Sequence, residues 1–220
     1  MPHSPRMKRF RDRTEAGRLL GERLRVGRFV DAVVLGLPRG GVAVAAEVGR
    51  ALDAQLDIVV ARKLGVPWQP ELAFGAVAPG VVVLQHDVLD AIGLEQDEID
   101  LAATRELARL GPLTERYRGE APAVLLADRT VIIVDDGLAT GATATAAARS
   151  VRQHGPRRVI VAVPVGAGPT VAALRAEVDD VVCLIVPDAF HAVGLYYDDF
   201  APVRDEEVCE LLAAGRGGRP

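Results

Sequence analysis

Short apolar runs alternate with helical patterns along most of the chain. The runs are of strand length and rich in Val, Ile and Leu, and most are followed by a turn and then by apolar residues at helical spacing. The strand-like runs lie at 31–37, 56–61, 130–135, 157–164 and 180–186. The helical patterns lie at 10–28, 42–52, 94–118, 141–154, 170–177 and 204–213. This order predicts an α/β fold, a Rossmann-like parallel sheet of about five strands with helices on both faces.

The segment from Arg62 to Gly80 interrupts this rhythm because it is rich in Gly and Pro. We expect a long loop there, followed by a short strand near 74–77 with which residues 81–85 could form a hairpin. No linker divides the chain, which favours a single domain over residues 1–220. Its core would span about 31–186, and a small hood would be built from the chain ends, at about 1–28 and 187–220.

Composition narrows the class of protein. Half of the 220 side chains are hydrophobic, which is enough to bury one sizeable core and excludes a mostly disordered chain. No apolar run approaches the roughly 18 residues of a membrane-spanning helix, so we expect no membrane association. The net charge of −4 argues against nucleic acid as a partner. The N-terminus lacks the apolar stretch of a secretory signal, and Cys183 and Cys209 predict reduced thiols in a cytoplasmic protein.

One stretch, Val131 to Thr143, carries candidate chemistry. An apolar strand is followed by Asp135 and Asp136, and then by a loop with Thr140, Gly141 and Thr143 that opens an Ala-rich helix. A helix N-terminus at the carboxyl end of a parallel strand is suited to bind a phosphate. Adjacent carboxylates repel each other and need a cation or a donor such as a sugar diol. The pattern therefore indicates a ligand with a phosphate at one end and hydroxyls at the other.

The same stretch resembles the motif with which type I phosphoribosyltransferases bind 5-phosphoribosyl 1-pyrophosphate (PRPP). The shared pattern is an apolar strand, two acids, two variable residues and Ala-Thr-Gly-small-Thr. The resemblance implies the type I phosphoribosyltransferase fold. It also implies that Asp135 and Asp136 hold the ribose hydroxyls and contact Mg²⁺ through water. The 5-phosphate would lie against Ala139, Thr140, Gly141, Ala142 and Thr143.

Two further stretches agree with this resemblance. Arg39, Gly40 and Gly41 follow the first strand, where the family has its pyrophosphate loop, and the bond from Pro38 to Arg39 would be the family's cis peptide. Arg62 and Lys63 follow the second strand and resemble the pair at the root of a mobile lid in orotate and adenine phosphoribosyltransferases. Residues 65–70 would form that lid. An ordinary glycine turn and a lysine at a strand end would account for the same residues.

The aromatic tail is a weaker match, to the base-binding hood of hypoxanthine-guanine phosphoribosyltransferases. Phe190 would stack on the base, with Val186 or Asp198 near its edge, although these aromatics could equally seal the end of the core. The hypoxanthine-type enzymes carry an acid where this chain has Ala139, so the motif leaves the acceptor open.

The function implied is Mg²⁺-dependent transfer of a phosphoribosyl group from PRPP to a nitrogen acceptor, with release of pyrophosphate. The acceptor would be a small molecule, a nucleobase with a purine favoured. The catalytic groups would be Asp135, Asp136, Lys63 and Arg39. The alternative is a non-catalytic protein that senses PRPP or a nucleotide. By analogy with small enzymes of this type, we expect a homodimer.

Overall fold

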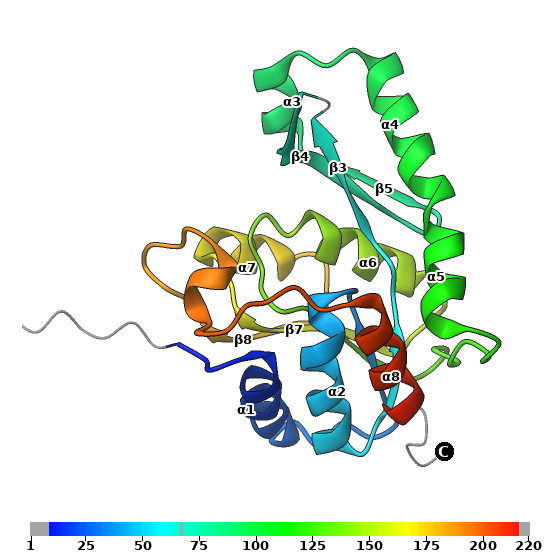
Figure 1. Cartoon of the computed structure of the whole chain (residues 1–220), viewed down its shortest axis with the longest axis vertical. Helices are drawn as coiled ribbons and strands as arrows, with labels where there is room; N and C mark the ends of the chain where they lie inside the picture. The colour runs from blue at the N-terminus through cyan, green and yellow to red at the C-terminus, as the bar shows by residue number, and fades with distance from the viewer. Residues whose placement is uncertain (1–8, 67, 216–220) are drawn as a thin grey trace, which may run out of the picture.

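The five predicted core strands lie in one parallel sheet in the computed structural model, which describes residues 9–66 and 68–215. Every neighbouring pair in this sheet is parallel. In sheet order the strands are β2 (Gln55–Ile58), β1 (Ala32–Gly36), β6 (Thr130–Val134), β7 (Arg158–Val165) and β8 (Asp180–Ile185). β1 and β6 are both buried along their whole length, which explains their continuous apolar sequences. The predicted sheet is confirmed (Figure 1).

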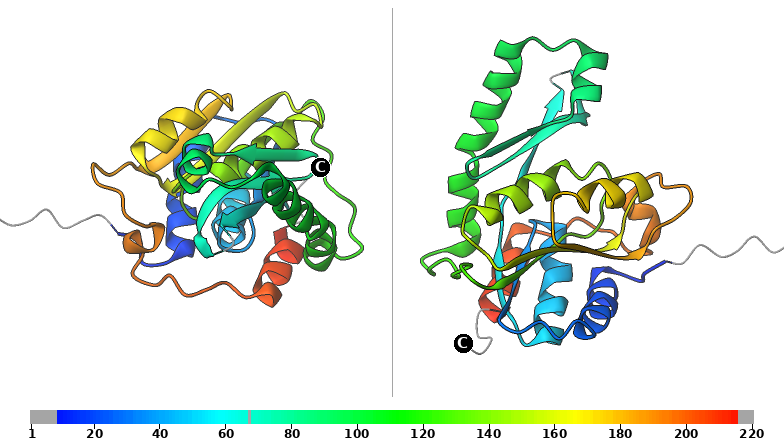
Figure 2. Two further views of the ribbon diagram at one scale, coloured as in Figure 1. Left: turned by 90° about the horizontal axis from the view of Figure 1, so that it is seen from above. Right: turned by 180° about the vertical axis from the view of Figure 1, so that it is seen from behind.

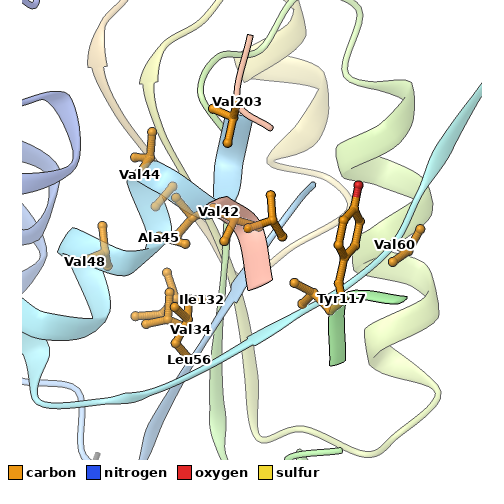
Figure 3. Close-up of a cluster of buried hydrophobic side chains, with 14 of the residues drawn as sticks. Val34, Val42, Val44, Ala45, Val48, Leu56, Val60, Tyr117, Ile132 and Val203 are labelled. Carbon is orange, nitrogen blue, oxygen red and sulfur yellow. The ribbon is translucent and has the colours of Figure 1, made fainter. Parts of the chain in front are cut away.

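Helices cover both faces of this sheet, as predicted. Three of them pack on one face: α1 (Arg13–Arg25), α2 (Gly40–Leu52) and α8 (Asp205–Gly215). The opposite face is covered by α6 (Ala142–Arg152) and α7 (Gly168–Leu174). Figure 3 shows the first interface, where Val42 and Ala45 of α2 lie on the side of the helix that faces Val34 and Ile132 of the sheet. Burial of these Val, Ile and Leu side chains supplies the main stabilisation of the layers.

The segment after β2 forms strands instead of the predicted long loop. β3 (Arg62–Val66), β4 (Gln69–Ala78) and β5 (Val81–Leu84) make an antiparallel sheet. The predicted strand near 74–77 and its hairpin with 81–85 are confirmed, and the predicted long loop is wrong. The register shifts around Gly65, and Gly75 lies so close to the Val83 carbonyl that a side chain would collide with it. Gly65 thus lies at a bulge and Gly75 at a close approach of two backbones. Without the strand pairing, glycines in a short segment are easily mistaken for loop residues.

These three strands belong to a projecting unit of residues 62–108, which we call the arm. It also contains α3 (His86–Ile92) and α4 (Gln96–Ala108). Figure 2 shows α6 running between the arm and the parallel sheet. α6 can be approached from both sides because it is rich in alanine, with Ala142 and Ala146 packed against Ala76 and Ala78 of β4.

The predicted single helix 94–118 is divided at Arg109 into α4 and α5 (Leu110–Arg118). Pro112 explains the break, because its ring clashes with the carbonyl four residues earlier and it has no N–H to donate. α5 leaves the arm and packs against α8 and β2. Tyr117 of α5 thereby enters the main core (Figure 3).

The N-terminal helix does not form part of the expected hood, whereas the tail after β8 does. α1 packs on α2 as a layer of the core, where Gly17 and Gly21 allow the two helices to touch. The tail does lie over the carboxyl end of the sheet: the short helix η1 (Val193–Tyr196) follows β8, and Phe10 bridges to Tyr197. Within the described residues, none of the helices has the length and apolar character needed to cross a membrane.

Candidate functional site

The site lies at the edge of the sheet between β1 and β6, where the order of the strands reverses. From β1 the chain crosses to β2 on one side, and from β6 it crosses to β7 and β8 on the other. β1 and β6 are neighbours, with Gly36 paired to Val134. The loops that follow them therefore leave the same edge of the sheet side by side, at the switch point where open α/β sheets bind ligands.

The structure brings most of the predicted site residues into one cavity of about 490 Å³. The predicted residues that line it are Arg39, Gly40, Arg62, Lys63, Asp135, Asp136, Ala139, Thr140, Gly141 and Thr143. Gly41 and Ala142 adjoin it in the first turns of α2 and α6. Two loops that are about 100 residues apart in the sequence thus form one continuous surface.

The acid pair sits at the floor of this cavity. The backbone N–H of Asp136 donates to Oδ1 of Asp135 at 2.8 Å, and Oδ2 of Asp136 accepts from Nε of Arg13 at 2.8 Å. Burial and the neighbouring Asp136 carboxylate raise the pKa of Asp135 well above its usual range, while the Lys63 ammonium lowers it. Two adjacent carboxylates in this setting attract a cation or hydroxyl donors.

The loop between Asp136 and α6, which we call the motif loop, is held by contacts with the end of β7 and with α7. Leu138 hydrogen-bonds to Val165 and Ala167 at the end of β7, and the Thr170 hydroxyl donates to the Ala139 carbonyl at 2.6 Å. Gly141, the N-cap residue just before α6, has a φ of +77°, and a Cβ there would lie 2.6 Å from Thr170 Cγ2. Only glycine fits both the dihedral angle and the space.

Two helix N-termini point at the cavity. α2 begins at Gly40 and α6 at Ala142, and neither has an acidic residue in its first turn. Their first N–H groups and positive dipole ends attract anions, and the carboxylates of Asp135 and Asp136 lie close to the N-terminus of α2 at Gly40 and Gly41. Together they suit a ligand with anionic groups at two places.

The basic side chains come from the loop after β1 and from the start of β3. Arg39 follows β1 across a cis peptide bond to Pro38, as the resemblance implied. Its guanidinium lies 3.7 Å from Asp205, whose carboxylate also pairs with Arg116 and accepts from Tyr117. Burial and this carboxylate raise the pKa of Tyr117 to about 12, so its hydroxyl stays a donor.

Arg62 and Lys63 are placed by β3, since they pair with Val77 and Ala76 of β4. The Arg62 guanidinium forms an ion pair with the Glu106 carboxylate of α4, which also pairs with Arg109. They therefore stand at the root of a strand pair. The predicted lid residues 65–70 lie at the tip of that pair, with residue 67 outside the described part.

The structure does not bring the predicted acceptor residues to the cavity. Phe190 stacks on Tyr196 at 5.9 Å, Val186 is half exposed, and Asp198 pairs with Arg9 at the surface. The tail residues that line the cavity are Val193 and Phe200. Val193 lies directly over Gly137, where any side chain would collide with it.

Arg13 and Tyr197 are site residues that the sequence did not indicate. The Tyr197 hydroxyl donates to the Asp136 carbonyl at 2.6 Å, and burial raises its pKa, which keeps it protonated. Arg13 is one arginine among many in the chain, and it lies 123 positions from Asp136. No local pattern distinguishes it, because the contact exists only once α1 is packed.

The residues fit Mg²⁺ as part of a substrate complex. Within residues 9–66 and 68–215 no group of three or more His, Cys, Asp or Glu side chains could hold a metal by itself. Mg²⁺, however, is commonly bound through one or two carboxylates together with substrate phosphates. Asp135 and Asp136 at a cavity with two anion-binding ends provide that donor set.

Residues 13–201 match the family model described as phosphoribosyl transferase domain. A Mycobacterium tuberculosis protein with the provisional name phosphoribosyl transferase Rv0571c is 47% identical over 207 residues. The alignment covers 94% of this chain, and the chain spans about half the length of that relative, at 47%.

Solved structures show the same architecture. The protein TT1426 from Thermus thermophilus is 47% identical with a TM-score of 0.79, and the match covers 95% of this chain and all of that one. The protein AQ2163 from Aquifex aeolicus shares the fold at 12% identity, with a TM-score of 0.51 over 93% of this chain and 85% of that one.

Proposed function

Because the chain belongs to the phosphoribosyl transferase domain family, we propose that it transfers a phosphoribosyl group from PRPP to a nitrogen atom of a small acceptor and releases pyrophosphate. One observation carries this proposal. The acid pair stands in one cavity between the motif loop at α6 and the loop at α2. This spacing of anion, hydroxyl and anion sites matches the 5-phosphate, ribose and pyrophosphate of PRPP.

Different residues of the cavity would bind the different parts of PRPP. Thr140, Gly141 and Thr143 would receive the 5-phosphate at the N-terminus of α6, with backbone N–H groups and hydroxyls as donors. Asp135 and Asp136 would accept hydrogen bonds from the ribose 2- and 3-hydroxyls. These contacts hold the sugar so that its reacting carbon faces the open part of the cavity.

Departure of pyrophosphate breaks the bond between C1 of the ribose and the pyrophosphate oxygen, and the electron pair leaves with that oxygen. Positive charge then develops on the ribose ring until the lone pair of the acceptor nitrogen bonds to C1, and the proton of that nitrogen passes to the released pyrophosphate or to water. Arg39, Lys63 and the N-terminus of α2 would stabilise the leaving anion. Arg39 would exchange its contact with Asp205 for a pyrophosphate oxygen. Mg²⁺, when bound with PRPP, would neutralise part of the same charge.

The acceptor is proposed to be a nucleobase, with a purine favoured, because the tail forms an apolar wall beside the cavity. Val193 and Phe200 supply this wall. A homodimer in the cytoplasm is part of the same proposal. The alternative, a sensor that binds PRPP without turnover, is distinguished by experiment.

The test is pyrophosphate release from PRPP and Mg²⁺ with purines and pyrimidines added one at a time. We expect release with one or a few bases, which would identify the acceptor. PRPP binding without release for any base would favour the sensor. No release and no PRPP binding would contradict the proposal.

A variant tests the acid pair in the same assay. Asp135→Asn with Asp136→Asn keeps the size of both side chains and removes the charge, so we expect turnover to fall by about 10²-fold or more. Asp188→Asn and Asp198→Asn in the exposed tail form the matched control. Normal turnover of the acid-pair variant, with the control also normal, would contradict the mechanism.

A further inference from the structure

Arg13, the first residue of α1, reaches into the site from the N-terminal end of the chain. Its Nε donates to Asp136 Oδ2 at 2.8 Å and its Nη1 donates to the Ala201 carbonyl at 2.8 Å. The guanidinium also lies over the Phe200 ring, 3.9 Å from its centre. Only 11% of the Arg13 side chain and 17% of the Asp136 side chain are exposed. This pair is therefore a nearly buried ion pair between the helix, the motif and the tail.

Each acid of the motif has one oxygen that accepts a hydrogen bond from elsewhere in the chain. Oδ1 of Asp135 accepts from the Asp136 backbone, and Oδ2 of Asp136 accepts from Arg13. The Asp135 and Asp136 carboxyl groups also form a side-chain hydrogen bond with each other, which contributes to the raised pKa of Asp135. Two neighbouring carboxyl groups, with Asp136 held in one orientation by Arg13, suit the two neighbouring hydroxyls of a ribose.

We propose that Arg13 is a positioning residue for PRPP binding, which orients the Asp136 carboxyl group toward the ribose diol. The inference rests on the proposed function, and it assigns a role to a residue outside the motif. Because Arg13 also binds Ala201 and stacks on Phe200, it fixes the tail wall of the cavity at the same time. The geometry requires arginine, since a lysine ammonium has neither the planar face nor the forked donors.

The test measures PRPP binding by calorimetry, with and without Mg²⁺, and the thermal midpoint of the ligand-free protein. Removing a residue that orients a ligating carboxylate typically weakens binding by about 10- to 100-fold. We expect a loss of that size in Arg13→Met. Arg18→Met is the matched control, because Arg18 lies on the same helix and, among the residues that the structure describes, pairs only with the exposed Glu22. The control should bind PRPP as the wild type does.

A double-mutant cycle separates positioning from a merely structural role. In an Asp136→Asn background, Arg13→Met should weaken PRPP binding by less than about threefold, because residues in contact have non-additive effects. An equal loss in both backgrounds would overturn the inference. So would wild-type PRPP affinity in Arg13→Met.

If Arg13→Met does not fold, Arg13→Lys is measured in its place. It should fold and bind PRPP more weakly than the wild type, with full affinity overturning the inference. A wild type that fails to bind PRPP would instead refute the proposed function, and the role of Arg13 with it. The two failures are thus distinguished by the wild type alone.

Discussion

At the scale of single residues, the contacts that shape the site join positions far apart in the chain. Asp135, Asp136 and the loop to Thr143 could be predicted from the sequence because their chemistry is contiguous and local. Arg13, Tyr197, Val193 and Phe200 could not, since each reaches the site only through packing of an end of the chain. Phe190 was misleading for the same reason: its ring faces Tyr196, away from the cavity lining.

Gly40 offers a residue-scale prediction. A Cβ at this position would overlap Oδ2 of Asp136 and lie 2.9 Å from Nε of Arg13. Gly40→Ala must therefore displace the ion pair, and we expect PRPP affinity to fall by about 10-fold or more. Gly111→Ala is the control, since a Cβ there meets nothing within 4 Å and alanine favours the helix. Calorimetry would check both, and unchanged affinity in Gly40→Ala would contradict the account of this contact.

At the scale of elements, hydrophobic patterning located the core strands and most helices to within a few residues. It failed in the arm, where Gly65 lies at a bulge between β3 and β4 and Gly75 lies close to β5, features that only the strand pairing reveals. It also joined α4 to α5, although Pro112 marks the break. Helix periodicity alone does not show such an interruption.

The alanine surface of α6 yields an element-scale prediction. Ala146 is fully buried between α6 and β4, in contact with the alanines of the arm. Ala146→Leu inserts three carbons into this interface and should lower the free energy of unfolding by about 1–3 kcal/mol. Ala172→Leu, at an exposed position of α7, should leave it nearly unchanged. Urea denaturation measures both, and equal stabilities would show that the arm is not tightly packed on α6.

At the scale of the whole molecule, the site is enclosed from three directions. The sheet edge supplies the acids and both helix N-termini, the arm supplies Arg62 and Lys63, and the tail supplies Phe200 and Val193. The sequence order predicted the sheet and its switch point, because parallel βαβ units restrict the topology strongly. The positions of the arm and the tail depend on long-range packing, which short motifs do not encode.

The central claim is that this cavity holds PRPP through the acid pair and the motif loop, and PRPP binding tests it most directly. Calorimetric titration of the wild type with PRPP and Mg²⁺ should give saturable binding in the range of about 1 μM to 1 mM, typical of enzyme substrates. The variant with both Asp135→Asn and Asp136→Asn, at an unchanged thermal midpoint, should bind at least about 10-fold more weakly. Equal affinity in the two proteins, or no binding by the wild type, would contradict the claim.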